Sequence, residues 1–359
     1  MIKISFVTGT RADFGLMKDI LKAIYDDPLF TLSVYATGMH LMNDFGNTID
    51  EVLKNFPHTK IIDAIYEHDD RASMANFIGK CLVKINSEYI QNKPDVVLVL
   101  GDRGEQLASC VAAKYLNIPI IHLHGGEVSG TVDNSIRLAI SSLSDYHFAA
   151  TEKSAQNLKK LAIPDNKIFV TGAPGLDKIV KLPPRKTKRQ IVVLQHPAEN
   201  EFAADNQIKI TLEAVLTFNL PIYVIFPNAD AGGRKMIKAI KDLASQNKLI
   251  KIFKSLPRSD FLSLLSESAV LVGNSSAGII ESASLKIPVV DIGERQKNRE
   301  RGINVLHVGY NKEEISLAIK KAIDDIDLIE KINSMRNPYG DRSTSKRVIK
   351  LLKLITNHE

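Results

Sequence analysis

Short apolar runs alternate with amphipathic helical patterns along the whole chain. Residues 96–100 are Val and Leu throughout, which is typical of a parallel strand covered by helices on both faces. Between such runs, residues 72–90 repeat apolar side chains at helical spacing. This alternation predicts doubly wound parallel sheets that bind ligands at the carboxyl ends of their strands. The predicted strands are residues 2–8, 31–37, 95–100, 118–122, 147–149, 168–171, 191–195, 221–226, 249–253, 269–272, 289–292 and 304–307.

Twelve strands fit two sheets better than one, and 359 residues fit about two domains of ~100–200 residues each. The segment 181–189 is rich in proline and charge and lacks a helical face, so it is the best candidate for a linker. We expect an N-terminal domain over residues 1–180 and a C-terminal domain over residues 188–336. A final helix within 343–359 is expected to join the first domain. Two such domains predict a ligand cleft between them.

Composition excludes several classes of protein. Apolar residues make up 44% and charged residues 25% of the chain, as in an ordinary globular protein with a buried core. The longest apolar stretches are far shorter than the ~20 residues of a membrane-spanning helix, and residues 1–8 suit a first strand better than a signal peptide. Cys81 and Cys110 have neither disulfide-framework nor zinc-site spacing, which is typical of core thiols in a reducing compartment. We therefore expect a cytoplasmic protein without a membrane partner.

The chain carries 47 basic and 41 acidic residues, a formal net charge of +6. The basic residues gather at 185–189, at 295–301 and along the last helix from Lys346. No aromatic residues interleave with them, and no zinc finger or recognition helix accompanies them. A site for an anionic small molecule therefore explains the excess charge better than a nucleic-acid surface does.

Two turns of the first predicted domain could carry chemistry. After the first strand, Gly9-Thr10-Arg11 leads into a helix, where backbone N–H groups and the Arg11 guanidinium could bind a phosphate. Arg11 could equally be a surface residue, with Asp13 as a helix cap. Asp102 follows the buried strand 95–100. It is either the N-cap of the next helix or a catalytic carboxylate at the edge of the sheet.

The stretch from His122 to Asp133 gathers two histidines, two carboxylates and three glycines directly after a strand. Proton transfer needs acids and bases close together, whereas a structural loop does not. A metal site is the rival interpretation, but His122 and His124 are two residues apart on a strand and would point to opposite faces. We therefore expect acid–base chemistry here, with His124 facing the cleft and Glu127 nearby.

The second half of the chain offers groups that could hold an anion or a sugar. His196 ends a strand and could donate to a phosphate, cap a helix or pack in the core, and Asn228 follows the next strand in what could be a plain turn. Ser275 precedes a predicted helix whose free N–H groups favour anions. Glu281, about one and a half turns into that helix, could accept from ribose hydroxyls or simply be solvated. The loop with Arg295 follows another strand and could meet a diphosphate.

Taken in order, these motifs closely resemble those of the hydrolysing UDP-N-acetylglucosamine 2-epimerases of sialic acid biosynthesis, over nearly the whole chain. The resemblance implies an α/β fold of the GT-B type: two Rossmann-like domains of doubly wound parallel sheet, with the nucleotide sugar in the interdomain cleft and the last helix packed on the first domain. The motifs that carry it are Thr8-Gly9-Thr10-Arg11-Ala12-Asp13, Thr37-Gly38-Met39-His40, Gly101-Asp102-Arg103, His124-Gly125-Gly126-Glu127, Ser129-Gly130-Thr131-Val132-Asp133, Asn274-Ser275-Ser276-Ala277-Gly278 and Gly293-Glu294-Arg295-Gln296.

Residue by residue, the resemblance assigns catalysis to Asp102 and Asp133. Many relatives have Glu where this chain has His124, although other branches resemble this chain in having His. His124 or Glu127 is then expected to take over that proton transfer. The residues assigned to nucleotide-sugar binding are Arg11, His196, Asn228, Phe261, Ser275, Ser276, Gly278, Glu281 and Arg295.

The implied reaction suits these residues. The C2 proton of the sugar becomes acidic as the C1–O bond to UDP breaks, so elimination yields a glycal, and water then adds to give N-acetylmannosamine and UDP. This chemistry needs no cofactor and no metal ion. The alternatives are the same chemistry on a UDP- or GDP-linked 2-acetamido or 2,4-diacetamido sugar for legionaminic acid, a GT-B glycosyltransferase, and a sugar-nucleotide-binding protein without catalysis. We also expect a homo-oligomer, either a dimer or a tetramer.

Overall fold

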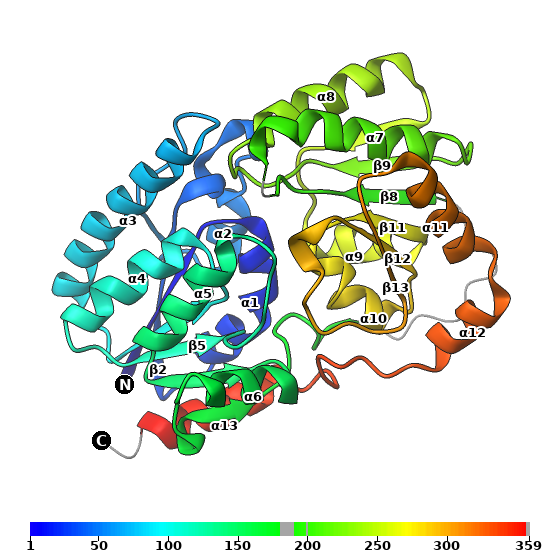
Figure 1. Ribbon diagram of the computed structural model, residues 1–359. Helices are drawn as coiled ribbons and strands as arrows, with labels where there is room; N and C mark the ends of the chain where they lie inside the picture. Colours follow the sequence, from blue (N-terminus) through cyan, green and yellow to red (C-terminus); the bar gives the residue numbers. More distant parts are fainter. Residues whose placement is uncertain (180–189, 199, 357–359) are drawn as a thin grey trace.

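The computed structural model describes residues 1–179, 190–198 and 200–356, and it contains two parallel β-sheets flanked by helices (Figure 1). The N-terminal sheet has seven strands in the order β3-β2-β1-β4-β5-β6-β7, and the C-terminal sheet has six in the order β10-β9-β8-β11-β12-β13. Every pairing between these strands is parallel. Each sheet extends outward from its first strand in both directions, as in a Rossmann fold, so the predicted fold class is confirmed. The predicted linker at 181–189 lies outside the described residues.

The strands agree with the apolar pattern to within two residues at each end. β3 is the exception, because it has only two residues, both exposed, and pairs with Tyr35 and Ala36 at the edge of the sheet. No apolar run could reveal it. The strands are β1 (Ile2–Thr8), β2 (Phe30–Ala36), β3 (Lys60–Ile61), β4 (Val96–Leu100), β5 (Ile120–Leu123), β6 (Tyr146–Ala149), β7 (Ile168–Val170), β8 (Gln190–Leu194), β9 (Ile222–Ile225), β10 (Ile250–Phe253), β11 (Ser268–Gly273), β12 (Val289–Ile292) and β13 (Val305–Val308).

Helices occupy the segments between the strands. Within the described part of the chain, none of them is both long and apolar enough to cross a membrane. The helices are α1 (Arg11–Tyr25), α2 (Ile49–Asn55), α3 (Arg71–Asn92), α4 (Gly104–Tyr115), α5 (Val132–Leu143), α6 (Glu152–Lys160), α7 (Ala204–Leu216), α8 (Gly233–Gln246), α9 (Arg258–Ser266), α10 (Glu281–Leu285), α11 (Lys312–Asp324), α12 (Ile326–Ser334) and α13 (Thr344–Thr356).

Both faces of the N-terminal sheet are covered, because alternate residues of a strand point to opposite sides. Val97 and Val99 pack in the same core as Cys81 of α3 and Cys110 of α4, which are buried free thiols. Leu98 packs in a second core with α1 and α13. Covered on both sides, β4 needs apolar residues throughout, and the two cysteines are core residues as predicted.

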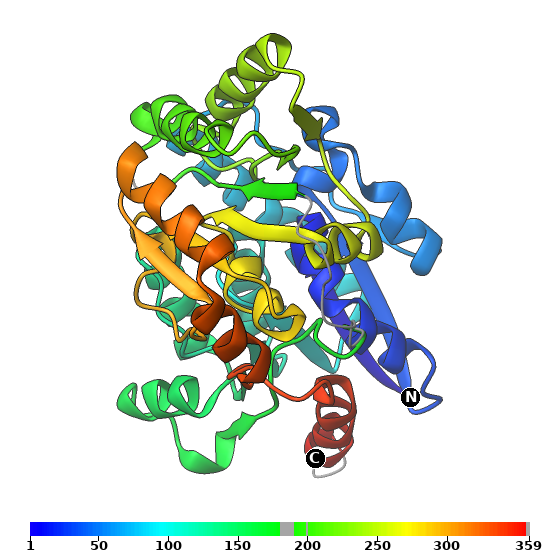
Figure 2. The ribbon, with the colours of Figure 1, turned by 90° about the vertical axis from the view of Figure 1, so that its right-hand side faces the viewer.

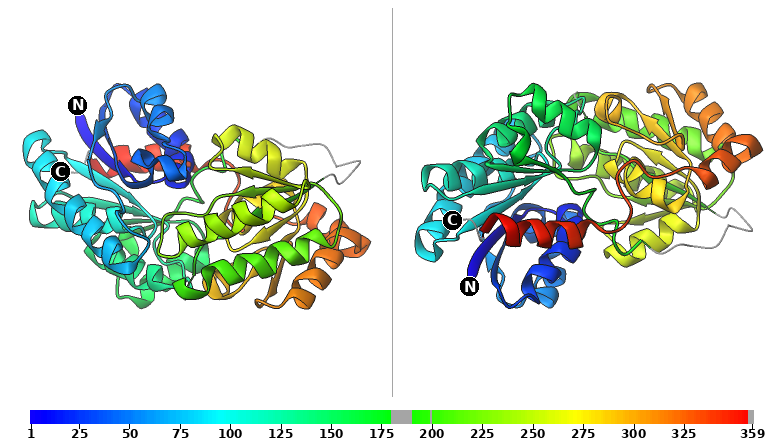
Figure 3. Two further views of the ribbon diagram at one scale, coloured as in Figure 1. Left: turned by 90° about the horizontal axis from the view of Figure 1, so that it is seen from above. Right: turned by 90° about the horizontal axis from the view of Figure 1, so that it is seen from below.

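The last helix returns to the N-terminal domain. Val348 and Leu352 of α13 are buried in the core that contains α1, and Figure 3 shows the two helices side by side. Asp177 fixes the start of α13, because its carboxylate accepts hydrogen bonds from the N–H groups of Thr344 and Ser345 at 2.7 and 2.9 Å. By contrast, α11 and α12 stay on the outer side of the C-terminal domain (Figure 2). Helix α13 therefore packs on the N-terminal domain.

Helix α8 of the C-terminal domain is capped by a side chain of the N-terminal domain. Its own N-cap residue, Gly232, has no side chain for this purpose. Instead, the Asp69 carboxylate accepts hydrogen bonds at 3.0 to 3.3 Å from three backbone N–H groups, those of Gly232, Arg234 and Lys235. Nε of Arg234 also lies 3.3 Å from Oδ2 of Asp44 in the N-terminal domain. The first turn of α8 keeps this cap only while the two domains are together.

Candidate active site

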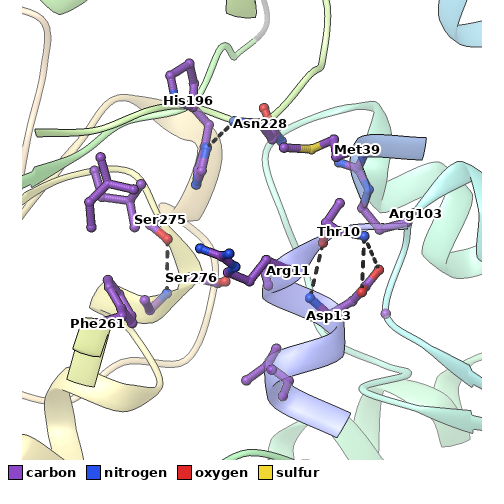
Figure 4. A pocket seen from close by; sticks show the side chains of 18 of the residues that line it. Thr10, Arg11, Asp13, Met39, Arg103, His196, Asn228, Phe261, Ser275 and Ser276 are labelled. Carbon is purple, nitrogen blue, oxygen red and sulfur yellow. Dashed lines mark hydrogen bonds between the residues drawn. The ribbon is translucent and has the colours of Figure 1, made fainter. Parts of the chain in front are cut away.

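A cavity of about 260 Å³ lies between the two domains. The N-terminal domain lines it with the turns after β1 and β4 and with His124 after β5, and the C-terminal domain with the turns after β8, β9 and β11. Figure 4 shows Arg11 of α1 reaching toward Ser275 and Ser276 of the other domain. The cavity therefore lies where parallel sheets present the carboxyl ends of their strands, as the topology predicts.

Ten of the thirteen residues that the sequence assigns to a site line this cavity. The other three are Glu127, which lies behind His124, Asp133, which lies beside Arg295, and Gly278, which packs in the C-terminal domain. The ten lining residues are Arg11, Asp102, His124, His196, Asn228, Phe261, Ser275, Ser276, Glu281 and Arg295.

His196 at the end of β8 is a neutral hydrogen-bond donor. The backbone N–H of Asn228 donates to its Nδ1 at 3.1 Å, so the ring proton is on Nε2. Burial and the positive charges of Arg295 and Arg103 hold the pKa of His196 well below its usual range. The side chain of Asn274 fixes the backbone here by accepting from the His196 N–H at 2.7 Å and donating to the His196 carbonyl at 3.0 Å. This imidazole can therefore donate to a phosphate oxygen without becoming charged.

The segment after β11 differs from the predicted continuous helix. A 3₁₀ turn, η5 (Ser276–Gly278), comes first, and α10 begins only at Glu281 and has five residues. Gly278 lies so close to β12 that a Cβ there would be 2.9 Å from Cγ1 of Val289, and this close packing accompanies the break. Ser275 therefore precedes a short 3₁₀ turn rather than one continuous helix. The donors at this position are instead the hydroxyls of Ser275 and Ser276 and local N–H groups.

Glu281 is buried and ion-paired. Nη1 of Arg258 lies 3.1 Å from Oε1 of Glu281, and Nη2 of Arg258 donates to the Gly175 carbonyl at 2.7 Å. Arg258 also lines the cavity, but no motif in the sequence marks it, because it stands alone at the start of α9. The pair places a carboxylate and a guanidinium side by side near Phe261, where hydroxyl and anionic groups of a ligand could both be held.

Arg11 lies in the first turn of α1, next to residues with a separate structural role. Thr10 and Asp13 form a capping box at this helix start. Nε of Arg11 lies 3.0 Å from Oε2 of Glu51, and burial lowers the pKa of Arg11 although Glu51 opposes this effect. The buried Nη1 of Arg11 has no hydrogen-bond partner among the described residues. Helix capping by Asp13 and anion binding by Arg11 are thus compatible.

His124 directs one ring nitrogen at Glu127 and leaves the other for the cavity. Its φ is +63°, which is uncommon for a residue other than glycine and turns the chain away from the line of β5. Nδ1 lies 2.7 Å from Oε1 of Glu127, and an ionised carboxylate can only accept, so Nδ1 donates its proton. Nε2 is buried and has no partner within the described part of the chain. This nitrogen is suited to exchange a proton with a ligand.

His122 has a structural role. Its Nε2 lies 2.8 Å from the Gly101 carbonyl and its Nδ1 lies 3.1 Å from Oγ of Ser141. Burial lowers the pKa of His122 to about 3. His122 and His124 thus have different partners, although His124 lies beyond the end of β5 and not on the strand. In residues 1–179, 190–198 and 200–356, no group of three or more His, Cys, Asp or Glu side chains could hold a metal ion.

Glu127 is an anion buried behind His124. Its Oε2 lies 3.1 Å from Nη1 of Arg137 and forms a second ion pair with Nη2 of Arg299. Burial alone would raise the pKa of Glu127, but Arg299 and His124 hold it well below its usual range. The sequence places Arg299 in the basic loop at 295–301 but does not reveal its pairing with Glu127, and no motif marks Arg137. Arg137 lies four residues after Asp133 on one helix, a spacing that places them on the same face and could have revealed it.

Asp102 and Asp133 have opposite pKa shifts. Burial would raise the pKa of Asp102, but its ion pair with Arg137 keeps it below the ordinary value. Burial and the charge of Asp102 raise the pKa of Asp133 to about 6. Asp102 does not cap α4, whose N-cap is Arg103 without a side-chain hydrogen bond. One carboxylate therefore stays ionised at neutral pH, while the other can carry a proton in weak acid.

Comparison with known proteins links this geometry to one group of enzymes. A family model described as UDP-N-acetylglucosamine 2-epimerase matches residues 22–353. A UDP-N,N'-diacetylbacillosamine 2-epimerase (hydrolyzing) of Legionella pneumophila is 40% identical over 99% of this chain and 97% of its own length. A UDP-N-acetylglucosamine 2-epimerase of Neisseria meningitidis is 32% identical over 90% of this chain and 88% of its own length. A crystal structure of the UDP-GlcNAc 2-epimerase from Neisseria meningitidis bound to UDP-GlcNAc has the same fold, with a TM-score of 0.82 at 24% identity over 98% of this chain and 99% of that chain.

Proposed function

Because the chain belongs to the UDP-N-acetylglucosamine 2-epimerase family, we propose that it is a hydrolysing 2-epimerase that converts a UDP-linked 2-acetamido sugar into UDP and the free sugar inverted at C2. The observation that carries this proposal is that one cavity has acid–base groups on one side and donors for a diphosphate on the other. On the N-terminal side, His124 and Asp102 line the cavity, with Glu127 hydrogen-bonded to His124 and Asp133 beside Arg295. On the C-terminal side, hydroxyl, imidazole and guanidinium donors line it around Ser275. Eliminating a nucleoside diphosphate with loss of a proton requires both.

Donors from both domains stabilise the departing diphosphate. Arg11 supplies a guanidinium from α1, and Arg295 supplies a second one, which is held by its hydrogen bond to the Asn274 carbonyl at 3.0 Å. His196 adds a neutral Nε2–H, and Ser275 adds a hydroxyl. Negative charge develops on UDP as the C1–O bond breaks, so these preorganised donors lower the barrier to bond cleavage.

Inversion at C2 requires two proton carriers, because the proton leaves one face of the sugar and returns on the other. We assign removal of the C2 proton to Nε2 of His124, whose Nδ1–H is held by Glu127. We assign its return to Asp133, whose raised pKa of about 6 allows it to carry a proton. Asp102 stays ionised and stabilises the positive charge at C1. When water adds its hydroxyl to C1, one of the spare protons restores Asp133 and the other leaves to solvent.

Two sugars are candidates for the substrate. UDP-N-acetylglucosamine is the sugar nucleotide that the sequence predicts, and the Neisseria relative is named for it. The Legionella relative, which is more similar and matched over more of its length, is named for UDP-N,N'-diacetylbacillosamine, a 2,4-diacetamido sugar nucleotide. We place the diacetamido sugar first because of this higher similarity. Its 2-epimerised product is the kind of sugar needed for legionaminic acid.

A glycosyltransferase and a non-catalytic sugar-nucleotide-binding protein are the alternatives. A transferase needs an acceptor site but no proton transfer at C2, so the pair of His124 and Glu127 would have no function in it. A binding protein would need the diphosphate donors but neither Asp102 nor Asp133. The buried acid–base groups beside the donors therefore support the epimerase.

Isotope labelling tests the proposed reaction. The UDP and GDP forms of both sugars are incubated with the protein in heavy water and, separately, in oxygen-18 water. We expect manno product with deuterium at C2 and UDP that is unlabelled at early times, because the carbon–oxygen bond is cleaved. A glycosidase would give no deuterium and no inversion at C2, a phosphohydrolase would place oxygen-18 on phosphorus, and a transferase would release little free sugar. Absence of C2 deuterium with a substrate that is turned over would refute the proposal.

Two further expectations from the sequence stay predictions. One is that the protein is a homo-oligomer, which light scattering during size-exclusion chromatography measures. The other is that it resides in the cytoplasm, which cell fractionation measures.

A further inference from the structure

Glu127 is held by cations from both domains. Its Oε2 lies 3.1 Å from Nη1 of Arg137 in its own domain. The same oxygen is paired with Nη2 of Arg299, which follows η6 (Glu294–Gln296) in the C-terminal domain. Both side chains of this interdomain pair are almost completely buried. The hydrogen bond between Glu127 and His124 therefore depends in part on a residue of the opposite domain.

Arg299 is also connected to the diphosphate donors. Its Nη1 donates to Oε1 of Gln296 at 3.1 Å, and Nε2 of Gln296 donates to the Asn274 carbonyl at 3.2 Å. Nη1 of Arg295 donates to the same carbonyl at 3.0 Å. Arg299 thus belongs to the loop that holds Arg295. Because Arg299 belongs to the C-terminal domain, its distance from Glu127 depends on how the two domains are placed.

We propose that Arg299 is a positioning residue that makes the pair of His124 and Glu127 competent for proton transfer only when the domains are closed around a ligand. This inference rests on the proposed role of His124 and extends its control to the other domain. With the domains closed, Glu127 is ionised and accepts the Nδ1 proton of His124. Nε2 is then unprotonated and can take the C2 proton.

Loss of Arg299 changes the state of Glu127. Burial disfavours an ionised carboxylate, and Arg299 is the strongest opposing influence on the pKa of Glu127. Arg137 cannot replace it, because Nη2 of Arg137 is paired with Asp102 and its Nη1 also donates to the His124 carbonyl at 3.1 Å. Without Arg299, Glu127 takes up a proton in part of the molecules and no longer fixes the tautomer of His124.

Arg299 lines the cavity, so two other roles must be distinguished from positioning. If Arg299 bound the diphosphate directly, its loss would weaken UDP binding. If it only held the domains together, its loss would reduce kcat by the same factor whether or not Glu127 can ionise. If Arg299 instead acts by positioning Glu127, UDP binding should not weaken, and the loss of kcat should depend on whether Glu127 can ionise.

A double-mutant cycle between Arg299→Gln and Glu127→Gln separates these roles through kcat, KM and UDP affinity. We expect R299Q to lower kcat by ~10²-fold, the usual scale for loss of general acid or base catalysis. Its UDP Kd should stay within about threefold of wild type, and its effect on kcat should shrink to less than about twofold when E127Q is already present. Arg299→Lys keeps the charge but not the planar guanidinium, and its kcat should be about tenfold higher than that of R299Q. A Kd that rises as much as kcat falls, or effects that multiply in the double variant, would overturn the inference.

Asp69→Asn is the matched control, because Asp69 also joins the two domains but contacts only the start of α8. Its effect on kcat should multiply with that of E127Q, since it does not act through Glu127. If the effect of Asp69→Asn on kcat also vanished in the E127Q background, the result for Arg299 would not be specific to its contact with Glu127, and the inference would fail.

A second readout requires no turnover. Protein with ¹⁵N-labelled histidine and saturating UDP should show a hydrogen-bonded Nδ1 proton of His124, identified by its loss in the His124→Gln variant. We expect this signal to be absent in R299Q, and its persistence there would overturn the inference. If the wild-type protein epimerised no sugar nucleotide, the proposed function would fall, whereas this measurement would still decide whether Arg299 sets the His124–Glu127 hydrogen bond.

Discussion

Nη2 of Arg295 in the C-terminal domain lies 4.0 Å from Oδ2 of Asp133 in the N-terminal domain. Gly130 allows this approach, because its N–H donates to the Arg295 carbonyl at 3.2 Å and a Cβ there would overlap the carbonyl oxygen of Glu294. A proposed diphosphate donor and a proposed proton carrier are therefore neighbours across the domain boundary. In the proposed site, UDP and the ionised Asp133 would compete for one guanidinium, so UDP binding and protonation of Asp133 would favour each other.

The variants Asp102→Asn and Asp133→Asn should each lose turnover by ~10²-fold or more, because each removes a carboxylate from the acid–base group. UDP binding should be unchanged for Asp102→Asn. For Asp133→Asn it should be unchanged or tighter, since the competitor for Arg295 is gone. Steady-state kinetics and calorimetry with UDP measure the two quantities. A loss of UDP affinity as large as the loss of rate would contradict the assignment.

The variants Ser275→Ala and Arg295→Ala should weaken UDP binding itself. Each removes a donor to an anion, a loss of about 1.5–3 kcal/mol, or roughly 10- to 150-fold in Kd. Ser259→Ala, at an exposed position on α9, is a control that should leave the Kd at the wild-type value. Unchanged UDP affinity in calorimetry for both site variants would place the nucleotide elsewhere.

The variant His124→Ala should lower kcat by ~10²-fold or more, the usual effect of removing a general acid or base. UDP affinity should change little, because the ring lies on the proton-transfer side of the cavity. Kinetics are corrected for the folded fraction, and the melting temperature is recorded in parallel. A lower melting temperature with unchanged turnover per folded molecule would make this histidine structural.

The pH dependence of stability offers a test without substrate. The pKa of Asp133 is raised to about 6 from 3.8, so the folded state binds this proton more tightly than the unfolded state does. Ionisation of Asp133 therefore destabilises the fold progressively between about pH 4 and pH 6, and the penalty is complete above that window. Asp133→Asn removes the penalty, so its melting temperature should exceed that of wild type at pH 7–8 and approach it near pH 4.

Melting temperatures measured across this pH range check the expectation. Asp63→Asn is the control, because the Asp63 side chain is 87% exposed and its substitution should give a small difference that does not vary with pH. An Asp133→Asn difference that is equally flat would show that Asp133 titrates near its ordinary pKa.

The local sequence pattern was enough to predict the strands, but it did not predict all parts of the site. A run such as Val96–Leu100 is apolar throughout because helices cover both faces of β4, so composition alone identifies it. The edge strand β3 buries nothing and leaves no pattern. The break between η5 and α10 accompanies close packing on β12, which lies beside β11 in the sheet. The apolar spacing of that segment does not reveal this contact.

The ion pairs of two arginines show a second reason. Arg299 pairs with Glu127, 172 positions earlier in the sequence, and Arg258 pairs with Glu281 across two elements. Nothing in their immediate neighbours predicts these partners, because an ion pair between domains depends on how the domains are placed. Nine of the ten lining residues that were found share another property. They follow strand ends or motif glycines, or begin helices, positions that the topology brings to a common edge. Phe261 lies within α9, and only the resemblance marks it.

The Asp69 cap makes helix α8 a reporter of motion within the molecule. An amide hydrogen whose acceptor belongs to the other domain exchanges with deuterated solvent when that domain moves away. The exchange rates of the amides of Gly232, Arg234 and Lys235 should therefore report how often the domains separate. No attached label is needed. Added UDP should slow exchange at these three amides, and Asp69→Asn should accelerate it there while the centre of α8 keeps its protection. Because the acceptor lies outside the catalytic cavity, the same amides can be followed in variants that no longer turn over substrate.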